Sequence, residues 1–137
     1  MSPIRWKSLS EFGAFVDVDP SDDLRSSVIE ELVELYHEHR LLLFRSQRLS
    51  GVRQRQVSKW FGPLLRDDDV DGFVSVDPQR GALGVSRLAY HSDLSWTPHP
   101  LLGLSLYAVE VTDGATSTLC SGNEARAELK QPAKRLK

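Results

Sequence analysis

A histidine and an aspartate two residues apart are the side chains of this sequence best suited to chemistry. His91 and Asp93 lie in residues 88–94, which are predicted to be extended. Residues two apart on a strand point to the same side, so an imidazole nitrogen and a carboxylate oxygen would face one ion. Such a pair, joined by a second histidine from elsewhere, makes the three-ligand face of a non-heme iron(II) oxygenase site. The pair therefore predicts part of an iron centre.

Two interpretations of this pair stay open on the residues alone. The pattern His-x-Asp fixes only two positions, and a chain with four histidines and 19 acidic residues produces it by chance fairly often. A surface histidine beside an aspartate is therefore the alternative to a metal site. His99 follows Asp93 by six residues, in a loop with prolines on both sides of it. It is a candidate third ligand, with a plain loop residue as the alternative.

The other residues that could bind a metal or act in catalysis are better explained by structural roles. His37 and His39 lie near the predicted end of a helix, where positive charge is favourable. Helix residues two apart do not share a face, so these two are interpreted as solvated helix-end residues. Cys120 is interpreted as a small core residue rather than a nucleophile. The acidic run at 67–71 lacks the glycine and glutamate spacing of a calcium loop and indicates a solvated loop.

Composition sets the broad class of the protein. The 137 residues are 40% hydrophobic and 26% charged, which is typical of one domain with a modest core. Seventeen basic and 19 acidic residues give a net charge of −2, so no basic excess points to nucleic acid or an anionic membrane. A small-molecule or protein partner is expected instead.

Cysteine usage and hydropathy bear on the compartment. The single cysteine excludes an internal disulfide, which fits a reducing setting. The first residues lack the apolar region of a signal peptide. No run approaches the roughly 20 apolar residues of a membrane span. We therefore expect a soluble, cytoplasmic protein.

The first half of the chain predicts two helices and two short strands. Apolar residues at helical spacing predict a helix from Leu24 to about Arg40, with residues 19–23 as its cap and acidic first turn. Ser50 is predicted to cap a second helix, which Gly62 and Pro63 end. The short apolar runs at 13–18 and 41–44 are predicted strands. One face of the second helix is predicted to pack through Val52, Gln56, Val57, Trp60 and Phe61.

Strands dominate the expectation for the second half. Alternating apolar residues make 101–111 the strongest predicted strand. Shorter strands are predicted at 73–76, 88–94 and 118–120, followed by a helix at 123–129. Helices that precede strands indicate an α+β protein. No linker or repeat divides residues 1–137, which are taken as one domain.

Several segments resemble one enzyme family, in its order and with its spacing. They are the aromatic-His-x-Asp stretch at 90–96, the proline loop at 98–100, the apolar strand at 104–111 and Thr118-Leu119. Upstream, residues 41–50 resemble the family's strand-to-helix segment, and 60–64 its Phe-Gly-Pro-Leu helix end. Over about residues 10–136, the chain resembles the taurine dioxygenase-like iron(II)- and 2-oxoglutarate-dependent dioxygenases.

The resemblance implies a fold, a cofactor set and a reaction. The family fold is a double-stranded β-helix, a cupin-like jelly roll with helices packed on one side, of which this chain would form part. His91 and Asp93 would bind Fe(II), and Asp93 fits a hydroxylase rather than a halogenase. Thr118 would contact a carboxylate of 2-oxoglutarate, although Ser117 stands where the family has aspartate. The implied reaction hydroxylates a small-molecule C–H bond while 2-oxoglutarate is decarboxylated.

The chain departs from the family in what it lacks. The second half of family members supplies the distal histidine ligand and the arginine that binds 2-oxoglutarate, so the domain is expected to be truncated. The first hypothesis is a dioxygenase that is active when a second chain supplies the missing half, or as part of a longer product; its expected partner is a complementing C-terminal half or a second copy in a homo-oligomer. The second is a non-catalytic fragment or interaction module. The third is a small cupin-like protein that binds metal through His91, Asp93 and His99. The substrate is not predicted.

Overall fold

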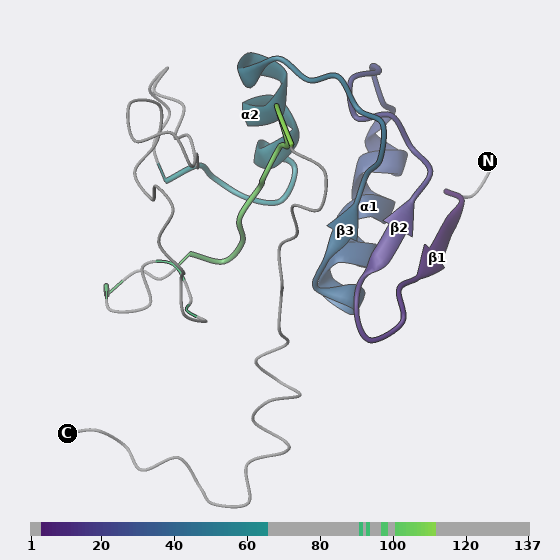
Figure 1. The fold of residues 1–137 in the computed structure, drawn as a ribbon, viewed down its shortest axis with the longest axis horizontal. Coiled ribbons are helices and arrows are strands. Elements are labelled where there is room, and N and C mark those ends of the chain that lie inside the picture. Colours follow the sequence, from purple (N-terminus) through teal and green to yellow (C-terminus); the bar gives the residue numbers. More distant parts are fainter. Residues whose placement is uncertain (1–3, 66–90, 92, 94–96, 99–100, 112–137) are drawn as a thin grey trace, which may run out of the picture. The chain divides into compact units, whose positions relative to one another are not determined.

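The computed structural model describes residues 4–65, 91, 93, 97–98 and 101–111. All of its helices and strands lie in the first of these ranges (Figure 1). The chain divides into two compact units, Met1–Tyr107 and Ala108–Lys137. Within the described residues, no helix is both long and apolar enough to cross a membrane.

A three-stranded mixed sheet begins the first unit. Its strands are β1 (Trp6–Ser8), β2 (Ala14–Val16) and β3 (Leu42–Leu43), in the order β1-β2-β3. β1 pairs with β2 antiparallel, and β2 pairs with β3 parallel. The strands predicted at 13–18 and 41–44 are therefore confirmed in shorter form. β1 was not predicted, because it has only three residues, all of them exposed, and one apolar residue among three is too weak a pattern.

A glycine lets the chain enter β2 close to β3. Gly13 has a φ of +95°, and a Cβ placed there would lie 3.0 Å from the Leu41 Cβ. Both the left-handed conformation and the close approach favour glycine. The Ala14 N–H then donates to the Leu41 carbonyl at 2.8 Å. This contact sets the start of the parallel pairing.

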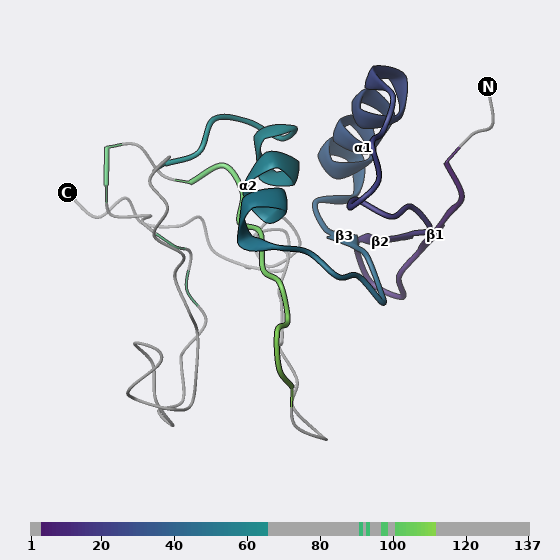
Figure 2. The same cartoon turned by 90° about the horizontal axis from the view of Figure 1, so that it is seen from above.

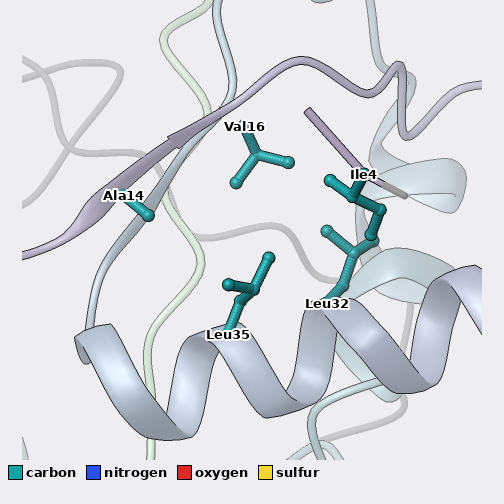
Figure 3. Close-up of a cluster of buried hydrophobic side chains, with 5 residues drawn as sticks. All are labelled: Ile4, Ala14, Val16, Leu32 and Leu35. Carbon is teal, nitrogen blue, oxygen red and sulfur yellow. The ribbon is translucent and has the colours of Figure 1, made fainter. Parts of the chain in front are cut away.

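Helix α1 (Ser26–His39) covers one face of the sheet (Figure 2). It also links β2 to β3, as parallel neighbours require a crossover connection. Its side chains Leu32 and Leu35 point away from the helix toward Ile4 and Val16 (Figure 3). The stripe predicted from Leu24 to Tyr36 thus identifies the correct buried face. The buried cluster consists of Ile4, Ala14, Val16, Leu32 and Leu35.

The predicted start of α1 was wrong. Its N-cap is Arg25, with no side-chain cap and no acidic residue in the first turn. The acidic turn at 19–23 is used elsewhere: the Asp19 carboxylate accepts from the Ser21 N–H at 2.8 Å. A side chain that closes its own turn is not free to cap the helix. The helix ends at His39, close to the predicted position, and its C-cap Arg40 has a φ of 65°.

Helix α2 (Gly51–Lys59) confirms the predicted cap at Ser50, whose hydroxyl accepts from the Arg53 N–H at 3.1 Å. Its packed face is narrower than predicted. Val57 is buried, whereas the side chain of Val52 is 58% exposed, so the placement of Val52 on that face was wrong. Trp60 and Phe61, just beyond the helix, pack against the core cluster. Because α2 is short, its packing depends on one apolar residue, Val57, and on the turn that follows the helix.

The strand predicted at 101–111 is not present, since none of these residues belongs to a strand. Alternation produces a strand only when a neighbouring strand accepts its backbone hydrogen bonds, and the described residues provide none. The strand predicted at 88–94 also fails at Asp93, which lies in a turn. Residues 73–76, 118–120 and 123–129 lie outside the described residues. The described residues contain the three-stranded sheet and two helices, which agree with an α+β protein.

Candidate functional site

The structure brings the two predicted metal ligands together. His91 Nε2 lies 3.2 Å from Asp93 Oδ1, and the two side chains are 50% and 42% exposed. The expected proximity of imidazole and carboxylate is thus present. The local conformation is a turn at Asp93 rather than the strand from which the proximity was predicted.

The separation of the two atoms suits a shared ion. Two donor atoms about 2.1 Å from one ion, at right angles to each other, lie about 3.0 Å apart. The observed 3.2 Å is close to that value. The same distance also fits a direct hydrogen bond from imidazole to carboxylate. Half exposure leaves both groups within reach of an ion and a small molecule from solvent.

The structure adds no third ligand to this pair. Among the described residues, no group of three or more histidine, cysteine, aspartate or glutamate side chains is placed to hold a metal. His99, Thr118, Cys120 and the acidic run at 67–71 lie outside the described residues. Their predicted roles stay predictions.

The two histidines at the end of α1 differ in their exposure to solvent. His37 is exposed, as predicted, with its ring 6.0 Å from that of Tyr36. His39 was wrongly expected to be solvated, because its side chain is only 16% exposed. It packs on Trp6 with ring centroids 4.7 Å apart. The edge strand β1 brings Trp6 over the end of α1, and β1 was not predicted from the sequence.

Polar side chains hold residues 101–107 in place of a strand ladder. The Tyr107 hydroxyl donates to the Gln47 carbonyl and accepts from the Leu49 N–H, both at 3.2 Å. Tyr36 donates its hydroxyl hydrogen to the Leu102 carbonyl at 3.3 Å. These contacts were missed, because a tyrosine within an apolar run is easily taken for an ordinary strand residue. The signal was the hydroxyl, which needs a partner when its ring packs.

A third side chain contributes to this attachment. The Gln54 amide, on α2, donates to the Ser105 carbonyl at 3.3 Å. The attachment therefore uses side chains from α1, from α2 and from the segment itself. It ties residues 101–107 to the helical part of the same unit, on the C-terminal side of His91 and Asp93.

An arginine organises the turn before α1. Arg53 Nε donates to the Pro20 carbonyl at 2.9 Å, and its guanidinium also donates to the Asp22 carbonyl. Hydrogen bonds from the Ser21 side chain and backbone lower the pKa of Asp19, and the charge of Arg53 lowers it further. This network stabilises the fold and lies outside the candidate metal centre.

Comparison with known families agrees with the motifs. The family model described as "Taurine catabolism dioxygenase TauD, TfdA family" matches residues 5–136. The match covers nearly all of the chain, including His91, Asp93 and Thr118. No curated protein matches the chain.

Proposed function

The chain belongs to the TauD/TfdA family of taurine catabolism dioxygenases, and from this premise we propose that it serves an iron(II)- and 2-oxoglutarate-dependent hydroxylation of a small molecule. The observation that carries the proposal is the pairing of His91 Nε2 with Asp93 Oδ1 at 3.2 Å. The family match supplies the class of reaction. The distance between the donor atoms supplies two groups suited to hold its metal.

His91 and Asp93 are the residues that would bind the iron. An imidazole nitrogen and a carboxylate oxygen suit Fe(II), and only three protein ligands are needed, so other positions stay open. When bound, the iron would allow dioxygen to oxidise 2-oxoglutarate to succinate and carbon dioxide and to hydroxylate the substrate C–H bond, one oxygen atom going to each product. The protein's part is to fix two donors on one side of the ion and leave the opposite side accessible.

The rest of the site is proposed from the family. The Thr118 hydroxyl would donate to a carboxylate of 2-oxoglutarate, and residues 1–137 would form one part of a jelly roll. The third ligand and the arginine for 2-oxoglutarate would come from beyond these residues, in a longer product, a complementing chain or a second copy. An arginine suits that task because it donates two parallel hydrogen bonds to a carboxylate.

Metal binding tests the proposal at the level of residues. Cobalt(II), a spectroscopic substitute for Fe(II), is titrated into the full chain and followed by absorbance. His91→Ala and Asp93→Ala should each weaken binding by more than about tenfold, because each removes one of two donors. His37→Ala is the matched control, since it removes an exposed histidine at a helix end and should leave binding unchanged. Equal binding by all variants would remove His91 and Asp93 from the site.

Turnover tests the reaction itself. With iron and ascorbate present, the chain, alone or with a complementing half, should convert 2-oxoglutarate to succinate slowly even without a substrate. His91→Ala should abolish this conversion, and the His37→Ala control should retain it. Conversion that is unaffected by His91→Ala would contradict the assignment of the metal ligands.

A non-catalytic interaction module is the second candidate, and one observation favours it. Large apolar side chains between residues 102 and 106 are exposed. An apolar run open to solvent is typical of a surface that another chain covers. The residues concerned are Leu102, Leu104 and Leu106. This candidate predicts partner binding with no turnover of 2-oxoglutarate, even with a complementing half present.

A further inference from the structure

Residues 101–107 have one side held by the helices of their unit, although they do not form a strand. The odd-numbered positions make that side. A Cβ on Gly103 would lie 2.6 Å from the Tyr36 hydroxyl oxygen of α1. The Ser105 hydroxyl accepts a hydrogen bond from an amide of α2, and Figure 2 shows the segment passing beside this helix. The Tyr107 hydroxyl binds two backbone groups of the loop before α2.

The even-numbered positions carry leucines that the helices leave open to solvent. Leu102, Leu104 and Leu106 are between 62% and 91% exposed. Such an alternation is that of an extended chain, in which successive side chains leave on opposite sides. These three residues are called the leucine row below. An apolar row open to water on an otherwise anchored segment is typical of a surface that another molecule covers.

The leucine row is suited to a second copy of the same chain. It is symmetric about Leu104, so an antiparallel copy would set Leu104 against Leu104 and Leu102 against Leu106. Residues 100–109 contain no charged side chain. Two copies of a chain with a net charge of −2 can therefore meet here without like charges facing each other.

The position of the helices also permits this approach. Since α1 and α2 hold the opposite side of the segment, a copy that reaches the leucine row does not meet them. The size of the row limits the strength of association. Stable interfaces bury about 1,200–2,000 Å², and three leucines on each copy form only the apolar centre of such an area. We therefore expect a weak dimer, with a dissociation constant of about 10–100 µM.

We propose that the chain forms a two-fold symmetric dimer in which the leucine rows of two copies pack against each other. The same surface serves both partners, so the interface closes on itself and assembly stops at two copies. This inference goes beyond the proposed function and requires no metal.

Leu104→Asp tests the inference, because this residue faces its own copy across the two-fold axis. Sedimentation velocity of the full chain, from about 5 to 500 µM without metal, spans the expected dissociation constant. The wild type should pass from monomer to dimer. The variant should raise the dissociation constant more than about tenfold, since two carboxylates would be buried facing each other. Leu65→Asp is the matched control, because Leu65 is 64% exposed and Leu104 62%, and it should dimerise like the wild type.

A mixture of Leu104→Asp and Leu104→Lys proteins tests the symmetry itself. Each variant alone should be monomeric, because like charges meet at the axis. In the mixture a carboxylate faces an ammonium group, so the mixed dimer should form at least about tenfold more tightly than either variant associates with itself. Circular dichroism should show the helix content of the wild type in every variant.

Five results would overturn the dimer. They are a wild-type chain that stays monomeric up to the highest concentration, open-ended aggregates in place of a dimer, wild-type association in Leu104→Asp, equal losses in Leu104→Asp and Leu65→Asp, and a mixture no tighter than its components. A monomer that binds only a complementing C-terminal half would assign the leucine row to that half and would also overturn the dimer. Cobalt(II) titration tests the metal site separately, so failure of either proposal leaves the other standing.

Discussion

Alanine at Gly103 should destabilise the protein through one atom, the Tyr36 hydroxyl oxygen. The new Cβ would lie 2.6 Å from that oxygen and 3.4 Å from Tyr36 Cζ. The first distance is a clash, and the second is an ordinary contact. The hydroxyl must move, which breaks its hydrogen bond to the Leu102 carbonyl.

The magnitude follows from two opposing effects. Losing the hydrogen bond costs about 0.5–1.5 kcal/mol, and strain from the displaced ring adds about 1 kcal/mol. Replacing glycine by alanine restricts the unfolded chain and returns about 0.4–1 kcal/mol. We therefore expect Gly103→Ala to lower the free energy of unfolding by about 1–2 kcal/mol. In a Tyr36→Phe background the clashing oxygen is absent, so the same change should be neutral or slightly stabilising.

Urea unfolding of four proteins measures this coupling: wild type, Gly103→Ala, Tyr36→Phe and the double variant. Circular dichroism reports the helices, and the slope against urea shows whether all four unfold alike. The two changes should couple by about 1.5–2.5 kcal/mol, the sum of the lost hydrogen bond and the strain, with the double variant more stable than the sum of the single changes predicts. Strict additivity would refute the close approach of Tyr36 to Gly103.

Three further predictions concern the first unit. Leu32 is fully buried, so Leu32→Ala should lower the free energy of unfolding by about 2–5 kcal/mol, while Val52→Ala, at an exposed site, should change it little; urea unfolding measures both. Ser50→Ala should cost about 1 kcal/mol in the same assay by removing the cap of α2, and a wild-type value would contradict the cap. The pKa of Asp19 is lowered in the folded state. The charged Asp19 carboxylate therefore stabilises the fold fully above the unfolded pKa near 3.8, and this contribution is lost as pH falls through the lower folded pKa. Asp19→Asn should flatten the acid side of a plot of unfolding free energy against pH, and an unchanged plot would contradict the assignment.

The sequence predicts elements whose stabilising contacts are local. The cap at Ser50 and the apolar stripe of α1 depend on residues three or four apart, and both are confirmed. The cap predicted from residues 19–23 failed because the Asp19 side chain closes its own turn, and that turn is also held at long range. Arg53, some thirty residues later, binds the carbonyls of Pro20 and Asp22. Spacing along a chain does not reveal such contacts.

The strand predicted at 101–111 failed for a similar reason. Alternation shows that one face is apolar, but a strand also needs a neighbour for its backbone. In the described residues, side-chain hydroxyls and an amide supply part of that bonding. The hydrogen-bonding partners of Tyr36 and Tyr107 lie about sixty residues away in sequence, so the pattern of either segment alone does not predict them.

For the candidate site, the proximity of the pair was predictable from its spacing, but its structural basis was not. Residues two apart can approach each other from a strand or from a turn, and here Asp93 lies in a turn. A turn lacks the regular hydrogen bonds that hold a strand, so it fixes two donors less firmly. Two donors alone also leave most of the coordination of an ion to water. Tight iron binding at His91 and Asp93 therefore requires both a further ligand and a rigid attachment of the chain beside them.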